Sequence, residues 1–192
     1  QRIASSPGEY SEMSFSHAGN ELALANRELG RVEIVDPRTD ETKRHLESNS
    51  CTHAVFSANG QVLVFDGYPD ATETARELRL VDWPSGNLRA TLPGRSIYLG
   101  TLALSPDGRW LAASGDRTVH LYDTQTGRLV HELFGHRGTI RKVVFSPDSR
   151  RLATAGTDEG VKLWHVATGQ YLLEFSAANR SSPNDCEFTP EG

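Results

Sequence analysis

The sequence predicts an all-β protein made of consecutive four-stranded sheets, because two markers recur along the chain with the same period. The first marker, S-x-x-G or a close variant, begins at residues 16, 57, 105 and 146, and a related TPEG begins at 189. The spacings between these positions are 41, 48, 41 and 43 residues. The second marker places an acidic residue four positions before a Gly or its substitute, as in DTQTG from Asp123, and HVATG from His165 is its variant. Two markers that keep one period predict a repeated structural unit.

The runs between the markers predict the elements of each unit. KVVFS, RLATA, VKLWHV and YLLEF are short, rich in Val, Leu, Phe and Tyr, and bounded by turn residues, which is typical of strands and hairpins. The S-P-D-G box supplies Pro and Gly for a tight turn, and the Asp of D-x-x-T-G can accept hydrogen bonds from backbone N–H groups two residues on. Each period therefore holds four strands in up-and-down order. The expected sheets span about 10–46, 52–92, 99–134 and 140–176. A partial sheet is expected at each end, with 1–4 as the end of a fourth strand and 184–189 as the inner strand of a fifth sheet.

These sheets are expected to stack face against face. Val161 and Leu163 lie on one side of their predicted strand, whereas Trp164 lies on the other, so both faces of the sheet carry apolar side chains. A sheet of this kind needs a neighbour on each face.

Residues 135–165 resemble a WD repeat. GH at 135, FSPD from Phe145, LATAGTD from Leu152 and VKLWH from Val161 are similar to the bacterial type of this repeat, although WH stands where WD is usual. The resemblance implies a β-propeller, in which each sheet is one blade. Such propellers usually close with seven blades, so the chain, whose only methionine is Met13, is expected to be an open arc or part of a longer protein.

The resemblance also implies a structural tetrad in the fourth blade. Asp158 is expected to accept from His136, whose other ring nitrogen meets the hydroxyl of Thr154, which in turn meets the indole N–H of Trp164. A hydroxyl, an imidazole and a carboxylate also make up a hydrolase triad, but a nucleophile must be exposed beside an oxyanion site. We therefore expect a structural role for the four residues and no catalytic residues.

Composition and charge exclude several other functions. The net charge of −5 disfavours nucleic acid and acidic membranes as partners, and no apolar run approaches the length of a membrane span. The cluster of Arg137, Arg141, Lys142, Arg150 and Arg151 lacks interleaved aromatic platforms on which bases could stack and is interpreted as a solvated surface. The two cysteines match no metal-ligand spacing, so we expect free thiols and no metal. No Gly-rich phosphate loop is present, so no cofactor is expected. The first thirty residues have no basic start followed by an apolar stretch, and we expect a cytoplasmic location.

The residues that contact a protein or peptide partner are expected on one rim of the propeller. In this family the loops from the fourth strand to the next first strand, and from second to third strand, lie at the rim called the top. The second repeat is the longest, and its extra residues fall in DGYPDATETARE, 66–77, one of these loops. Arg and Tyr are frequent interface anchors, and the candidates are Tyr68, Asp70, Arg95, Tyr98, Arg117, Arg137, Glu159 and Arg180.

The leading hypothesis is a non-catalytic scaffold for protein interactions. One alternative is a propeller-type enzyme or ligand-binding domain that uses the central channel, where the first strands would present Glu12, His53, Thr101 and Arg141, a chemically mixed set. A second alternative is self-association: an open arc leaves an apolar face uncovered at each end, so the isolated chain would form homo-oligomers or aggregate.

Overall fold

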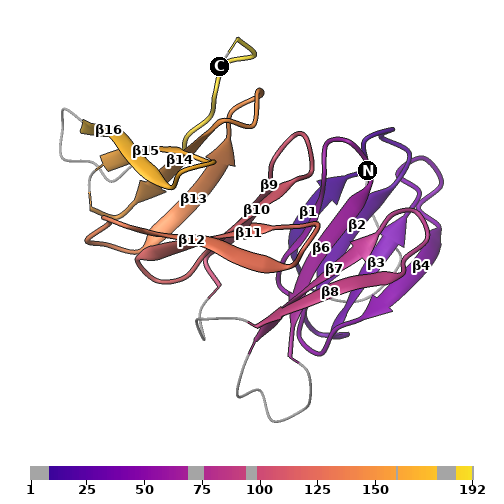
Figure 1. Ribbon diagram of the computed structural model, residues 1–192. Coiled ribbons are helices and arrows are strands. Elements are labelled where there is room, and N and C mark those ends of the chain that lie inside the picture. The colour runs from indigo at the N-terminus through magenta and orange to yellow at the C-terminus, as the bar shows by residue number, and fades with distance from the viewer. Residues whose placement is uncertain (1–8, 69–75, 94–98, 159, 177–184, 192) are drawn as a thin grey trace. The chain divides into compact units, whose positions relative to one another are not determined.

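Four four-stranded antiparallel sheets make up the computed structural model (Figure 1), which describes residues 9–68, 76–93, 99–158, 160–176 and 185–191. In each sheet the strands pair in chain order, as the repeat predicts. The chain divides into two compact units, residues 1–97 and 98–192, with two sheets in each. Among the described residues, no helix is long and apolar enough to cross a lipid bilayer.

Unit 1 contains the first two sheets. The first consists of β1 (Tyr10–Phe15), β2 (Leu22–Asn26), β3 (Arg31–Val35) and β4 (Thr42–Glu47). The second consists of β5 (Ala54–Phe56), β6 (Val62–Gly67), β7 (Glu77–Asp82) and β8 (Leu88–Pro93). A buried cluster joins the two sheets: Ala23, Ala25, Val32 and Ile34 of the first pack with Phe56, Leu63, Phe65 and Val81 of the second.

Unit 2 contains the other two sheets. The third consists of β9 (Thr101–Leu104), β10 (Trp110–Ser114), β11 (Thr118–Asp123) and β12 (Arg128–Phe134). The fourth consists of β13 (Ile140–Phe145), β14 (Arg151–Gly156), β15 (Gly160–His165) and β16 (Gln170–Ser176). Trp110, Val119, Leu121 and Leu133 of the third sheet form one core with Val143, Phe145, Leu152 and Trp164 of the fourth.

The serine of the first marker closes the same turn in all four sheets. Its hydroxyl accepts a hydrogen bond from a backbone N–H five residues later, as in Ser105, which accepts from Trp110 at 2.9 Å. Ser16, Ser57 and Ser146 do the same for Glu21, Val62 and Arg151. The fourth marker residue has a positive φ, which is 74° at Gly108 and 61° at Ser149. Glycine is frequent at this position because a Cβ disfavours that backbone conformation.

The segment predicted to be a fifth inner strand differs from the prediction. Its described part, residues 185–189, forms no β-strand, since no other described segment pairs with it. It lies instead beside the fourth sheet, where Asp185 is 3.3 Å from the Lys142 ammonium and Phe188 lies under the Arg151 guanidinium. Cys186, Glu187, Phe188 and Thr189 line a cavity of about 340 Å³ together with Arg151, Ala153, Val161, Leu163 and Phe175.

Candidate functional site

Four side chains of unit 2 form a closed hydrogen-bond network around the hydroxyl of Thr154. The Trp164 Nε1 is 2.9 Å from this hydroxyl, which is 2.7 Å from Nε2 of His136. His136 Nδ1 is 2.7 Å from Oδ1 of Asp158. Trp164 donates to the Thr154 hydroxyl, because an indole only donates, and His136 Nδ1 donates to Asp158, because a carboxylate only accepts. The network is thereby satisfied from end to end.

The network has no features of a nucleophilic site. Thr154 is fully buried, His136 is almost fully buried, and the Thr154 hydroxyl is already shared by two partners. A substrate would have to displace a buried hydrogen bond to reach it. The arrangement fixes the positions of the 135–139 connection and of the turn before β15.

Asp158 also binds the backbone of the adjacent loop. Its Oδ2 accepts the backbone N–H of Arg137 at 2.8 Å, while Oδ1 is used by His136. Burial opposes ionisation, but the hydrogen bonds from Arg137 and His136 outweigh it and hold the pKa of Asp158 below its usual value. The carboxylate is therefore charged at neutral pH and ties two loops together.

A second set of hydrogen bonds joins these loops to the third sheet. The Thr139 hydroxyl lies 3.2 Å from Oδ1 of Asp116, and the Ile140 N–H donates to the Asp116 carbonyl at 2.9 Å. Residues 115–117, 135–139 and 157–158, which we call the unit 2 rim, thus form one connected surface. Arg117 and Arg137 are both exposed on it.

The other predicted partner-binding residues have different positions. Tyr68 is only 8% exposed and its ring lies under the guanidinium of Arg76 at 4.8 Å, so it is part of the packed structure and not the free anchor that the sequence suggests. The remaining candidates lie outside the described residues: Asp70, Arg95, Tyr98, Glu159 and Arg180.

Unit 1 contains a buried polar cluster that the sequence interpretation missed. Asp66 on β6 is fully buried and accepts from the backbone N–H groups of Thr52 at 2.7 Å and His53 at 2.6 Å, and from the Thr52 hydroxyl at 2.7 Å. Arg76 forms an ion pair with the same carboxylate and donates to the Thr52 hydroxyl at 2.7 Å. A carboxylate inside the apolar run VLVFD is the signal that could have revealed the cluster, because a buried charge requires partners.

The thiol beside this cluster is not an activated nucleophile. Burial raises the pKa of Cys51 to about 12, so the thiol keeps its proton and lies 3.3 Å from the His53 carbonyl oxygen and 3.6 Å from Asp66 Oδ1. Both cysteines are free, as predicted. The described residues contain no group of three or more His, Cys, Asp or Glu side chains placed to hold a metal ion.

The proposed channel residues do not form a recognisable catalytic set within either unit. In unit 1, Glu12 accepts the Ala54 N–H at 3.2 Å and the His53 ring is 2.8 Å from the Thr52 hydroxyl. In unit 2, Thr101 begins β9 and Arg141 is an exposed residue of β13. Glu12 and His53 are therefore engaged in contacts that hold unit 1 together.

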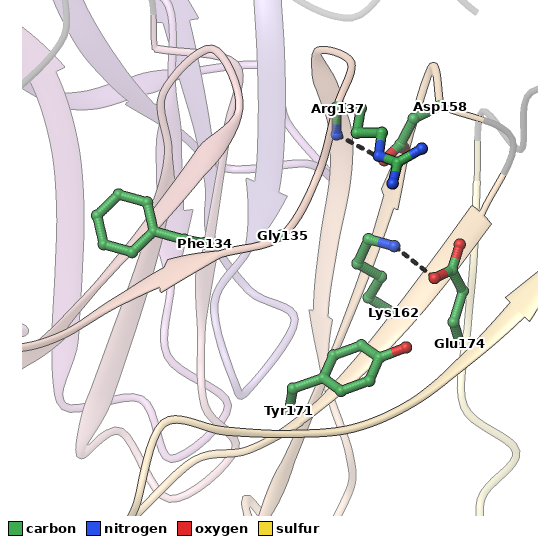
Figure 2. Close-up of a pocket in the computed structure, with 7 residues that line it drawn as sticks. All are labelled: Phe134, Gly135, Arg137, Asp158, Lys162, Tyr171 and Glu174. Atoms are coloured by element: carbon green, nitrogen blue, oxygen red, sulfur yellow. Dashed lines mark hydrogen bonds and ion pairs between the residues drawn. The ribbon is translucent and has the colours of Figure 1, made fainter.

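A cavity of about 420 Å³ opens next to the unit 2 rim. It is lined by Phe134, Gly135, Arg137, Asp158, Lys162, Tyr171 and Glu174. Figure 2 shows the Lys162 ammonium and the Glu174 carboxylate facing each other, with the Tyr171 ring below them and Arg137 beside Asp158. The Lys162 and Glu174 charges are 2.7 Å apart.

Comparison with known families matches two segments of the chain, 86–123 and 127–165, to the family model described as WD domain, G-beta repeat. The chain belongs to the WD-repeat family. The His136, Thr154, Asp158 and Trp164 network lies in the second of these WD repeats.

Several curated proteins are similar over most of this chain. Meiotic recombination protein rec14 of Schizosaccharomyces pombe is 32% identical over 148 residues, which cover 73% of this chain and 46% of rec14. A guanine nucleotide-binding protein subunit beta of Lymnaea stagnalis is 28% identical over 77% of this chain and 42% of its own length. Autophagy-related protein 16 of Arabidopsis thaliana is 29% identical over 72% of this chain and 26% of its own length. The chain thus spans less than half of each of these relatives.

Among solved structures, hydrazine synthase of Kuenenia stuttgartiensis superposes with a TM-score of 0.76 at 16% identity, covering 92% of this chain and 51% of that chain. At this identity the likeness concerns the fold alone. The four sheets of the WD-repeat chain are blades of a β-propeller, as the sequence predicts.

Replacing Thr154 with Val tests the network around the hydroxyl. The substitution keeps the side chain's shape but leaves the Trp164 N–H and His136 Nε2 buried without their shared partner. We expect a loss of about 2–4 kcal/mol in the free energy of unfolding, measured by urea denaturation. Thr101→Val, at a half-buried strand position, is the control, with an expected change under about 0.5 kcal/mol. Equal effects of the two substitutions would contradict a special role for Thr154.

Replacing Asp158 with Asn tests the charge of the carboxylate. Because the pKa of Asp158 is lowered on folding, its ionised form stabilises the protein above the pKa of the unfolded chain, about 4. This contribution is lost as the pH falls through the lower pKa of the folded state. The difference in unfolding free energy between the wild type and Asp158→Asn should be constant from pH 7 to about 5 and shrink below about 4. Denaturation curves that stay parallel down to pH 3 would be the contrary result.

Proposed function

We propose that this chain is a non-catalytic protein-interaction module and that a protein partner contacts the unit 2 rim through Arg117 and Arg137. The observation that carries the proposal is that two exposed arginines stand on loops whose backbone is fixed by Asp158 and Asp116. Arginine is enriched among the residues that dominate interface energies. A rim that is already ordered loses little conformational entropy when a partner binds.

The relatives support this proposal at the level of the family. One of them is by name a subunit, which means that it works as part of a larger assembly. In unit 2, His136 and Asp158 have side chains of catalytic types, and both hold loops in place. In unit 1 the thiol of Cys51 remains protonated. We extend the proposal to a cytoplasmic location, for which the two free cysteines are the support.

Charge reversal on the rim tests the proposal. We expect the wild-type chain to capture a partner from its own cells in a saturable manner, and the Arg117→Glu, Arg137→Glu double variant to lose it. The purified partner should then bind the wild-type chain at least tenfold more tightly than the variant in calorimetry, as expected for the loss of one or more interface anchors. Arg128→Glu is the matched control, because Arg128 is exposed at the other end of β12 from the rim. Capture that is unchanged by the double variant, or that the control reduces equally, would contradict the proposed surface.

Self-association is a second candidate, favoured by apolar side chains that the fold leaves exposed. Phe175 and Leu173 on β16 are 60% and 40% exposed, and Met13 and Phe15 on β1 are 60% and 58% exposed. Covering sheet faces of this composition with another surface lowers the free energy, because apolar side chains are removed from water. Copies of the chain are one such surface.

Light scattering with size-exclusion chromatography tests self-association. The wild-type chain should elute above its monomer mass in a concentration-dependent way, and Phe175→Asp should shift it toward the monomer. Leu88→Asp, which changes a residue that is 61% exposed on β8, should leave the mass distribution as it is. A wild-type chain that is a single monomeric species at all concentrations would rule this candidate out.

A further inference from the structure

The cavity beside the unit 2 rim has the features of a ligand site and not only of a gap between strands. Its lining comes from five places in unit 2: the end of β12, the 135–139 connection, the turn before β15, and strands β15 and β16. Its walls are fixed. A Cβ at Gly135 would lie 3.2 Å from the Trp164 ring, and Asp158 is held by two hydrogen bonds.

Both anionic groups in the cavity already have partners. Asp158 uses one oxygen for His136 and the other for the Arg137 backbone, and Glu174 is 2.7 Å from the Lys162 ammonium. A cationic ligand would therefore have to displace an existing interaction. The lining therefore favours a ligand that carries a hydrogen-bond acceptor over a cationic ligand.

The two cationic groups, in contrast, have N–H donors that can still bind a ligand. No described residue accepts a hydrogen bond from the Arg137 guanidinium, which stands beside the cavity in Figure 2. The Lys162 ammonium has three hydrogens, and among the described residues Glu174 is the partner that faces it. The Lys162 side chain is only 7% exposed, and a charged hydrogen bond at a site so shielded from solvent is strong.

Tyr171 supplies an apolar wall next to these donors. Its ring packs edge-to-face on Trp164, with centroids 5.5 Å apart, and remains 47% exposed. The Lys162 stem adds to the same wall, since its Cδ would be 3.7 Å from a Cβ at Gly135. Phe134 is not part of this wall, because its ring points away from the ion pair in Figure 2. An apolar side chain of the ligand could therefore cover the Tyr171 ring while an anionic group reaches Arg137.

We propose that this cavity binds an acidic side chain of an extended peptide, with the carboxylate between Arg137 and Lys162 and a neighbouring apolar residue against Tyr171. The inference rests on the proposed protein-binding function and names the chemistry of the bound segment. A carboxylate fits better than a phosphate. The cavity already contains two carboxylates, Asp158 and Glu174, and they repel a group with nearly two negative charges more strongly than one with a single charge.

Nuclear magnetic resonance with defined peptides tests the site on the whole chain. The probe is the acetylated, amidated peptide Gly-Leu-Glu-Leu-Gly, and the same peptide with Gln in place of Glu is its neutral match. The Glu peptide should shift the backbone amides of Gly135 and Arg137 and the indole N–H of Trp164, and should bind about tenfold more tightly than the Gln peptide, since one charged hydrogen-bonded contact is lost. A peptide with phosphoserine in place of Glu should bind more weakly than the Glu peptide, and sodium acetate should give far smaller shifts at equal concentration.

Substitutions of single arginines test which side chain binds the Glu peptide. Arg137→Ala should weaken the Glu peptide about tenfold and leave the Gln peptide unchanged, whereas Arg117→Ala, another exposed arginine of the same rim, should change neither. Arg137→Lys should restore part of the affinity because it keeps the charge. The proposal is overturned if the Glu and Gln peptides bind equally, if the phosphoserine peptide binds best, if Arg117→Ala matches Arg137→Ala, or if no peptide shifts these signals.

The outcomes separate this inference from the proposed function. Loss of the cellular partner in the rim variants, together with no response to the Glu peptide, would remove the peptide site and leave the interaction module. A specific response to the Glu peptide, together with partner capture that ignores the rim, would remove the proposed rim contact and leave the peptide site.

Discussion

The constraint on which the structure depends is that these sheets are apolar on both faces. Water is excluded from such a sheet only if a second sheet lies against it, and in each unit two blades satisfy each other in this way. Trp110 and Trp164 come from neighbouring sheets and share one core in unit 2, and Ile34 and Phe65 do so in unit 1. The sequence repeats because each unit of about 40 residues is stable only next to a similar one.

Hydrogen bonds decide how the loops lie on this apolar framework. In unit 2 the loops at the rim are tied to buried strand residues through a chain of hydrogen bonds that ends at an ionised Asp158. In unit 1 the corresponding task falls to a buried carboxylate, Asp66, which holds the segment before β5 and the start of β7 through Thr52 and Arg76. The two units thus reach ordered loops by different chemistry, and the difference leaves Arg117 and Arg137 as exposed charges on a fixed backbone in unit 2.

The repeat made much of the fold predictable, because the turn chemistry of each copy is local. Ser105 closes its turn through its own backbone neighbours, so its role can be inferred from a few consecutive residues. The four residues of the network around Thr154 are recognisable for another reason, because they occupy the tetrad positions of a WD repeat. Asp66 and Arg76 have no fixed positions in the repeat pattern. Every residue of β6 is buried, so the apolar pattern of this strand does not indicate which partner Asp66 contacts. Tyr68 shows the same limit: its position beside a long loop suggested exposure, but the Arg76 guanidinium covers its ring. The strand predicted at 184–189 is not formed by residues 185–189, because no other described segment supplies the partner that a ladder requires.

The contact between Tyr68 and Arg76 has a consequence for how this protein could be altered. The two residues flank the positions 69–75, and both are anchored: Arg76 by the ion pair with Asp66, and Tyr68 by stacking under Arg76. When the ends of a connection are clamped together, the entropy cost of a longer connection grows only with the logarithm of its length. A foreign peptide of variable length can therefore be inserted between Tyr68 and Arg76. The second blade would then hold both ends of the inserted peptide in fixed positions.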